Sequence, residues 1–170
     1  MKNVKKMTGV ALLMALVVVP IVMGAALYGP QTGALLGAAF GVVVVIGCIS
    51  GTDVGGAMVF QANPILCVLV VMGKGILAGF LSGVVYAALK QKNSTLAMVL
   101  AAAVCPVVNT GTFVLCMAAF FMDVLSVWAG GSNVLGYILS GLMLCNFVPE
   151  LVINLIFSGA GVRILKSLDK

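Results

Sequence analysis

The stretch PILCVLVVMGKGILAGFLSGVVYAAL, which runs from Pro64 to Leu89, decides the fold class of this chain. It is longer than the about 20 apolar residues that cross a lipid bilayer as one helix. A spanning β-strand would alternate apolar and polar residues, whereas this stretch contains one charged residue, Lys74, and the run 41–46 is apolar throughout. Because backbone polar groups in lipid must be paired internally, the sequence predicts membrane helices.

The rest of the chain has the same character. Of its 170 residues, 63% are hydrophobic and 8% are charged, whereas a soluble domain carries about 25% charged residues. This composition leaves too little polar surface for a water-soluble globule. We therefore expect an all-α integral membrane protein whose residues 1–170 form a single transmembrane domain in the lipid bilayer.

Apolar blocks and glycine ladders organise this domain. Five clear apolar blocks recur, at residues 7–28, 33–50, 64–89, 95–122 and 134–158. Glycines recur every four residues in two of them, as Gly33, Gly37, Gly41 and as Gly75, Gly79, Gly83. Small residues at this spacing share one helix face and let neighbouring backbones approach closely, which predicts tight helix packing in a compact bundle.

Charge placement predicts the topology. Basic residues gather before the first block (Lys2, Lys5, Lys6), between the third and fourth (Lys90, Lys92), and after the last (Arg163, Lys166, Lys170). The net charge of +5 therefore indicates orientation and not a nucleic-acid partner. The positive-inside rule places all three groups, and both termini, in the cytoplasm of a multi-pass cell-membrane protein. The loops that carry Asp53 and Asp123 then face outward.

This topology requires one more crossing than the blocks provide. An even number of crossings must precede Lys90, yet only three blocks do. The first block contains Pro20 in mid-run, but its residues 7–28 are too few for two crossings, which need roughly 40. Either the block folds as two short or re-entrant pieces, or residues are missing between Val19 and Pro20, which we prefer. The expected fold is a six-helix transmembrane bundle with a short first hairpin.

Polar residues at membrane depth are costly and are the first candidates for a binding site. Lys74 lies far from both ends of its block and is expected to contact either a ligand carboxylate or an acidic side chain of the protein. Asn109 and Thr110 lie between Pro106 and Gly111, which weaken a helix. These two polar residues either line a pocket at a broken helix or make local hydrogen bonds that stabilise a kink.

Other polar and aromatic residues have two interpretations as well. Glu150 shares one helix face with Asn146 and Asn154, and we expect this face to point into the bundle, where Glu150 makes a helix–helix contact or docks a partner. Trp128 is either an interfacial anchor or an aromatic lid on a ligand. Gln61 and Asn63 precede Pro64 and face outward in the predicted topology.

Catalytic and metal-binding patterns are missing from the sequence. It has no histidine, only four acidic residues and no phosphate-binding loop, so we expect neither an enzyme, nor a metal site, nor a cofactor. The five cysteines lie within apolar blocks without a C-x-x-C pair. They are interpreted as small buried residues and not as disulfide or zinc ligands.

Several segments resemble the substrate-binding S components of energy-coupling factor (ECF) transporters. Residues 20–30 (PIVMGAALYGP) and 32–37 (TGALLG) resemble the second and third helices of that family. Residues 74–79 (KGILAG) and 108–113 (VNTGTF) resemble the fourth and fifth. The order and spacing of these segments extend the resemblance over nearly the whole chain.

The resemblance implies a six-helix protein that captures a vitamin-like micronutrient and works with a membrane coupling subunit and two cytoplasmic ATPase subunits. It implies that Ala11 and Ala15 on the first helix face the coupling subunit. It implies a ligand pocket near the outer surface, which in this sequence points to Gln61, Asn63, Lys74, Asn109, Thr110 and Trp128. The first block departs from the family pattern because it lacks an outer loop that would help to cover the ligand.

The expected function is therefore uptake of a small water-soluble vitamin, with ATP hydrolysed by the partner subunits. An intramembrane lysine suits a ligand that bears a carboxylate, and pantothenate is one candidate. A self-sufficient secondary transporter or channel for a small polar solute is the first alternative. A membrane assembly factor that transports nothing is the second.

Overall fold

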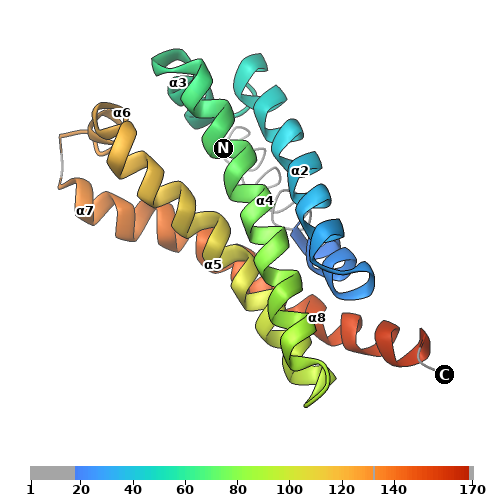
Figure 1. Cartoon of the computed structure of the whole chain (residues 1–170). Coiled ribbons are helices and arrows are strands. Elements are labelled where there is room, and N and C mark those ends of the chain that lie inside the picture. The colour runs from blue at the N-terminus through green and yellow to red at the C-terminus, as the bar shows by residue number, and fades with distance from the viewer. Residues whose placement is uncertain (1–17, 132, 169–170) are drawn as a thin grey trace.

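The computed structural model describes the backbone of residues 18–131 and 133–168, and within these ranges the side chains of 143–146, 165, 166 and 168 are not described. The described residues form helices and no strand (Figure 1). In chain order the helices are Val18–Tyr28, α2 (Pro30–Ser50), α3 (Val54–Ala62), α4 (Pro64–Leu89), α5 (Ser94–Phe120), α6 (Met122–Trp128), α7 (Val134–Tyr137), the π-helix η1 (Ile138–Phe147) and α8 (Val148–Leu168).

Three of these helices, α2, α4 and α5, are long and apolar enough to cross a membrane. They have 21, 26 and 27 residues, lengths that match a hydrocarbon core about 30 Å thick with some tilt. The predicted all-α architecture, with helices long and apolar enough to span a membrane, is confirmed for the described residues. The number of six crossings stays a prediction.

The start of the chain differs from the expected hairpin in the part that is described. Residues 18–28 form one helix that continues through Val19 and Pro20, and the chain turns only at Gly29, whose φ of 97° is open to glycine. Pro30 then begins α2, a position where its missing N–H costs nothing. The first part of the predicted block, residues 7–17, lies outside the described residues.

The two glycine ladders face each other, which confirms the predicted tight packing. Helices α2 and α4 run antiparallel and side by side (Figure 1). A Cβ built on Gly37 would lie 2.6 Å from the carbonyl carbon of Gly75, and one built on Gly33 would lie 2.9 Å from that of Gly79. Backbone therefore contacts backbone along this interface, an approach that any side chain would prevent.

Small residues also hold α5 against α4. Ala97, Ala101 and Ala102 of α5 are almost fully buried. Ser82 of α4, itself fully buried, donates a hydrogen bond from Oγ to the carbonyl oxygen of Ala101 at 2.9 Å. Such a bond satisfies a hydroxyl that would otherwise be unpaired at membrane depth.

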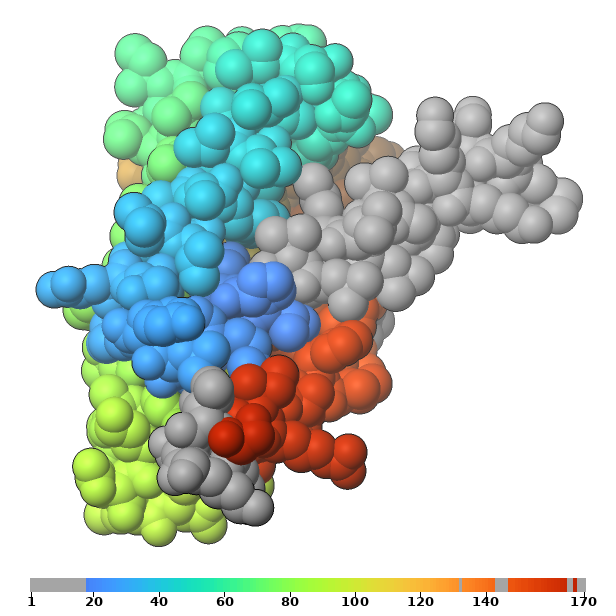
Figure 2. Space-filling view, turned by 90° about the vertical axis from the view of Figure 1, so that its right-hand side faces the viewer, coloured from blue at the N-terminus to red at the C-terminus, as the bar shows by residue number. Residues whose placement is uncertain are grey.

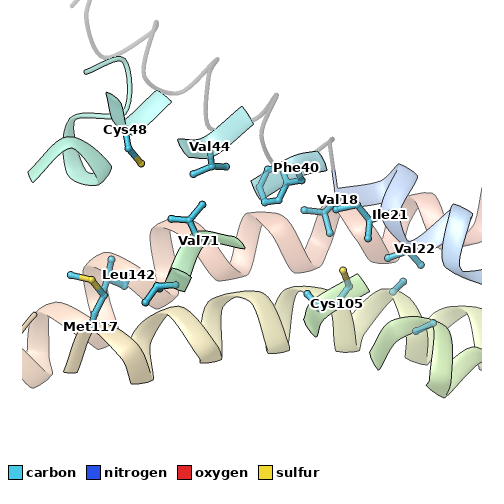
Figure 3. Close-up of a cluster of buried hydrophobic side chains, with 14 of the residues drawn as sticks. Val18, Ile21, Val22, Phe40, Val44, Cys48, Val71, Cys105, Met117 and Leu142 are labelled. Atoms are coloured by element: carbon cyan, nitrogen blue, oxygen red, sulfur yellow. The ribbon is translucent and has the colours of Figure 1, made fainter. Parts of the chain in front are cut away.

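A continuous apolar core lies between these helices. Phe40, Val44 and Cys48 line one face of α2 and point toward Val71 of α4 and the helices beyond it (Figure 3). The opposite face of α2 exposes Val43 and other large apolar side chains. Apolar side chains that face outward from apolar helices are in the arrangement expected for contact with lipid.

Charged residues are separated toward the two ends of the bundle. At one end, α3, which Asp53 caps, packs against α6, which contains Asp123. At the opposite end of α4 lies the turn with Lys90 and Lys92. The end of α8 that carries Arg163 lies on the same side as this turn (Figure 2). Gly161, close to this end of α8, packs against the side chains of Met23 and Met98. Lys90, Lys92 and Arg163 thus lie toward one end of the bundle, which agrees with the positive-inside argument.

Candidate functional site

Polar side chains lie at mid-depth on α4, α5 and α8, where α5 packs against each of the other two helices. Lys74 is ten residues beyond Pro64 in α4, which places it roughly 15 Å along the helix. Its side chain is partly buried, and Nζ lies over the ring of Phe113, 4.8 Å from the centroid. Among the described residues no carboxylate lies within ion-pair distance of Lys74. The cation is therefore held by an aromatic face, which compensates only part of the cost of burying its charge.

Asn109 and Glu150 form the second part of the cluster. Both are buried, at 7% and 8% exposure. Asn109 donates a hydrogen bond from Nδ2 to Glu150 Oε1 at 3.2 Å, which joins α5 to α8. Asn154, one turn further along α8, donates from Nδ2 to the backbone carbonyl of Glu150 at 2.8 Å. Glu150 and Asn154 have the expected inward orientation and Glu150 makes a helix–helix contact, whereas the side chain of Asn146 lies outside the described residues.

One atom of this cluster has no partner. Asn109 Oδ1 is the one buried side-chain nitrogen or oxygen without a hydrogen bond in the described part of the chain. An unpaired buried acceptor costs about 1–3 kcal/mol and needs a physical reason. The site therefore combines an unpaired acceptor on Asn109 with the Lys74 amino group over Phe113, which lies four residues further along α5.

The backbone near Asn109 is not broken. Helix α5 continues through Pro106 and Gly111 without interruption, so the pocket at a broken helix is not formed. Pro106 is accommodated within the helix and is itself buried. Irregular backbone occurs instead in the partner helix, where η1 widens the turns directly before Glu150. Such π segments are frequent at functional sites.

Thr110, which follows Asn109 in α5, lines a small cavity. It is buried at 8% exposure. The cavity has a volume of about 290 Å³ and is lined by Val107, Thr110, Gly111, Val114, Leu115 and Phe147. Its walls come from α5 and the end of η1, and Thr110 supplies their one polar side chain. Lys74, Asn109 and Glu150 are not among the residues that line this cavity.

Gln61, Asn63 and Trp128 lie apart from this cluster, near the acidic end of the bundle. Asn63 caps α4, because its Oδ1 accepts a hydrogen bond from the backbone N–H of Leu66 at 3.1 Å. Gln61 is exposed. Lys74 is eleven positions after Asn63, which corresponds to roughly 16 Å of helix. The six predicted ligand residues therefore form two groups, Lys74 with Asn109 and Thr110 at mid-depth and the other three at the end.

Trp128 packs against the short helices at this end. Its Nε1 donates to Met58 Sδ of α3 at 3.3 Å, and its ring lies against Tyr137 of α7, with centroids 6.4 Å apart and planes inclined by 56°. Gly55 of α3 faces the same ring, since a Cβ there would be 3.4 Å from it. Trp128, the last residue of α6, thus joins α6 to α3 and α7 at the acidic end.

Trp128→Ala is expected to lower the free energy of unfolding by about 2 kcal/mol, because it removes an aromatic pair and the contact with α3. Trp128→Phe keeps a ring against Tyr137 and is expected to lose less than half as much. The measurement is thermal unfolding of the purified protein in detergent. Equal stability of Trp128→Ala and the wild type would show that the contacts of Trp128 with Met58 and Tyr137 do not contribute to the free energy of unfolding.

Sequence reasoning did not assign Phe113 to the site, nor Glu150 to a contact with Asn109. Phe113 is four residues after Asn109, so the helical period alone would have placed it on the same face. The partner of Asn109 has no local signal, because Glu150 is 41 residues away. Ala11 and Ala15, predicted to contact a coupling subunit, lie outside the described residues.

Comparison of the chain with protein-family models, with curated proteins and with solved structures finds no match. The resemblance to ECF S components therefore stands on the sequence segments alone. Any function has to be argued from the membrane-like helices and from the chemistry of the cluster around Lys74.

Proposed function

We propose that this protein is the substrate-binding component of an ATP-driven importer of the ECF type, and that its ligand is a small carboxylate-bearing micronutrient. The observation that carries the proposal is Lys74, a cation in the middle of a long apolar helix with no ion-pair partner among the described residues. A charge at this depth is expensive and marks a functional site by default. A ligand carboxylate is the group that compensates it.

The alternative internal partner is engaged elsewhere. Glu150 accepts a hydrogen bond from Asn109 and lies beyond ion-pair distance from Lys74. This arrangement favours the ligand interpretation of Lys74 over the internal pair. Pantothenate stays one candidate, because it combines a carboxylate with polar groups that Asn109 and Thr110 can bind.

The proposal includes six crossings, both termini in the cytoplasm, and a coupling subunit with two ATPase subunits as partners. Two observations support it. The described basic groups gather at one end and the acidic loops at the other, and the sequence segments occur in the order found in ECF S components. In this proposal Ala11 and Ala15 face the coupling subunit, and Gln61, Asn63 and Trp128 belong to the outer entrance of the site.

The test has two arms. Mass spectrometry of the protein purified in mild detergent is expected to detect a retained small molecule that carries a carboxylate. Liposomes that contain the protein with its co-purifying subunits are expected to take up this molecule only when ATP is supplied on the ATPase side. Uptake by the protein alone, without ATP, would instead identify a self-sufficient transporter or channel.

A further inference from the structure

The last helix carries an open groove on its outward face. Within the described part of the chain this groove, with a volume of about 510 Å³, is lined by Ile156, Gly159, Ala160, Arg163 and Ile164 of α8. These residues follow each other at spacings of three and four, so they share one helix face. All of them are exposed, and Figure 2 shows this end of α8 at the surface of the molecule. The groove therefore opens toward the surroundings of the bundle.

Two large and two small residues give the groove its shape. Ile156 and Ile164 stand at its two ends, with 68% and 46% of their surfaces exposed. Between them lie Gly159 and Ala160, and a Cβ built on Gly159 would have no atom within 4 Å. The middle of the groove is thus an open apolar notch. On a membrane helix such a notch is filled by an acyl chain or by another helix, because the bilayer core offers no other contact.

Arg163 adds a positive charge beside this notch. Of the acidic residues in the described ranges, Glu150 is thirteen positions earlier in α8, which corresponds to roughly 20 Å of helix. Asp53 and Asp123 lie at the opposite, acidic end of the bundle. None of these carboxylates neutralises Arg163, so its guanidinium group can bind an anion that comes from outside the described part of the chain.

The charge favours a lipid over another helix as the occupant of the groove. A guanidinium group within a contact between two membrane helices would require an acidic partner. An anionic phospholipid instead brings a phosphate, which an arginine can bind through two parallel N–H groups. The sequence beyond the groove is basic as well, since Lys166 and Lys170 outnumber Asp169. Basic groups close to the cytoplasmic end of a membrane helix attract anionic headgroups.

We propose that the outward face of α8 binds one anionic phospholipid, with the headgroup phosphate on Arg163 and an acyl chain in the notch at Gly159 and Ala160. An arginine near the end of a membrane helix extends its guanidinium group to the level of the headgroups while its stem stays in apolar surroundings. One helix face thus offers both a cation for the phosphate and an apolar surface for the chain. Lys74 does not line this groove, so the lipid site and the proposed function are tested independently.

Two lipids that differ only in their headgroups test this site. Dioleoylphosphatidylglycerol is anionic and dioleoylphosphatidylcholine is zwitterionic, and both carry the same acyl chains. Their binding to the full-length protein in detergent is measured by native mass spectrometry during a titration. The wild type is expected to prefer the anionic lipid about fivefold, the value of one basic side chain at an anionic headgroup. Inorganic phosphate, which has the anion without the chains, is expected not to displace it.

Two pairs of variants separate the charge from the notch. Arg163→Gln is expected to lose the preference, whereas Lys90→Gln, which removes a charge at the same end of the bundle but outside the groove, keeps it. Ala160→Leu fills the notch and is expected to weaken binding of both lipids without changing their ratio. Ala88→Leu makes the same change in α4 and is expected to bind both lipids as the wild type does. All four positions are exposed, so the variants are expected to fold.

Equal affinity of the wild type for the two lipids would overturn the proposal, as would displacement of the anionic lipid by inorganic phosphate. A preference that persists in Arg163→Gln would reject Arg163 as the headgroup contact. If Ala160→Leu binds both lipids as tightly as the wild type, the notch does not hold an acyl chain. Loss of another membrane subunit from that variant would then identify the groove as a protein interface. Loss of the preference in Arg163→Gln, together with weaker binding by Ala160→Leu and unchanged controls, supports the lipid site.

Discussion

Lys74→Ala is expected to release the retained ligand and to weaken binding of a carboxylate probe on the order of 100-fold. Removing one member of a buried charge pair costs several kcal/mol, and each 1.4 kcal/mol is a factor of about ten in affinity. The effect is large because Lys74 is the one charged residue of α4, and it lies far from both ends of that helix. Calorimetric titration of the purified variant with N-acetyl-β-alanine measures the change.

The stability of Lys74→Ala is expected to stay the same or to increase, although its affinity for the ligand falls. Burial of a cation beside an aromatic ring costs more free energy than a well-packed alanine does, so Lys74→Ala is expected to unfold at an equal or higher temperature than the wild type. Lys74→Arg keeps the charge over Phe113 and is expected to retain part of the affinity. Lys90→Ala removes a lysine from the exposed turn at the end of the same helix and serves as the matched control. Unchanged affinity in Lys74→Ala would reject the carboxylate site.

The long helices could be predicted from the sequence because apolar length and capping residues coincide. The predicted block from Pro64 to Leu89 has the bounds of α4, where Asn63 supplies the cap and Pro64 the first residue. The blocks that became α2 and α5 differ from them by at most three residues at either end. In these segments the requirement to pair every backbone group in lipid allows one conformation only.

The short helices were missed for a physical reason. Residues 51–56 and 123–133 contain glycine and polar residues and were interpreted as loops, yet they contain the start of α3 and most of α6. These helices have nine and seven residues, too few to be stable alone. Their helical conformation depends on tertiary contacts, above all the hydrogen bond from Trp128 to Met58. A local sequence pattern cannot reveal such contacts.

The sequence singled out candidate polar residues but not the contacts that they make. Depth in an apolar block was enough to single out Lys74 and Asn109. Of the two alternatives at Pro106 and Gly111, the broken helix did not form, because a helix packed against neighbours on both sides can accommodate a proline. That Glu150 accepts a hydrogen bond from the Asn109 amide follows from the packing of α5 on α8, and this packing is set by the whole bundle.

Gly37→Ala is expected to lower the free energy of unfolding by about 2–3 kcal/mol, the range found when a packed interface is overfilled. The added Cβ would meet the carbonyl group of Gly75, whose carbon would be 2.6 Å away. Backbone atoms cannot rotate out of the way as a side chain does, so α2 and α4 must separate. Separation would also loosen the contact between Gly33 and Gly79. Unfolding of the purified protein in mixed micelles by a denaturing detergent measures the loss.

Gly73→Ala provides a control of opposite sign. Gly73 lies in α4, two residues from Gly75, but a Cβ built on it has no atom within 4 Å. Alanine favours a helix over glycine by up to about 1 kcal/mol, so this substitution is expected to be neutral or stabilising. The two variants make the same chemical change, and only one of them lies in the contact between α2 and α4. Equal effects of Gly37→Ala and Gly73→Ala would contradict the close backbone contact on which the arrangement of the bundle depends.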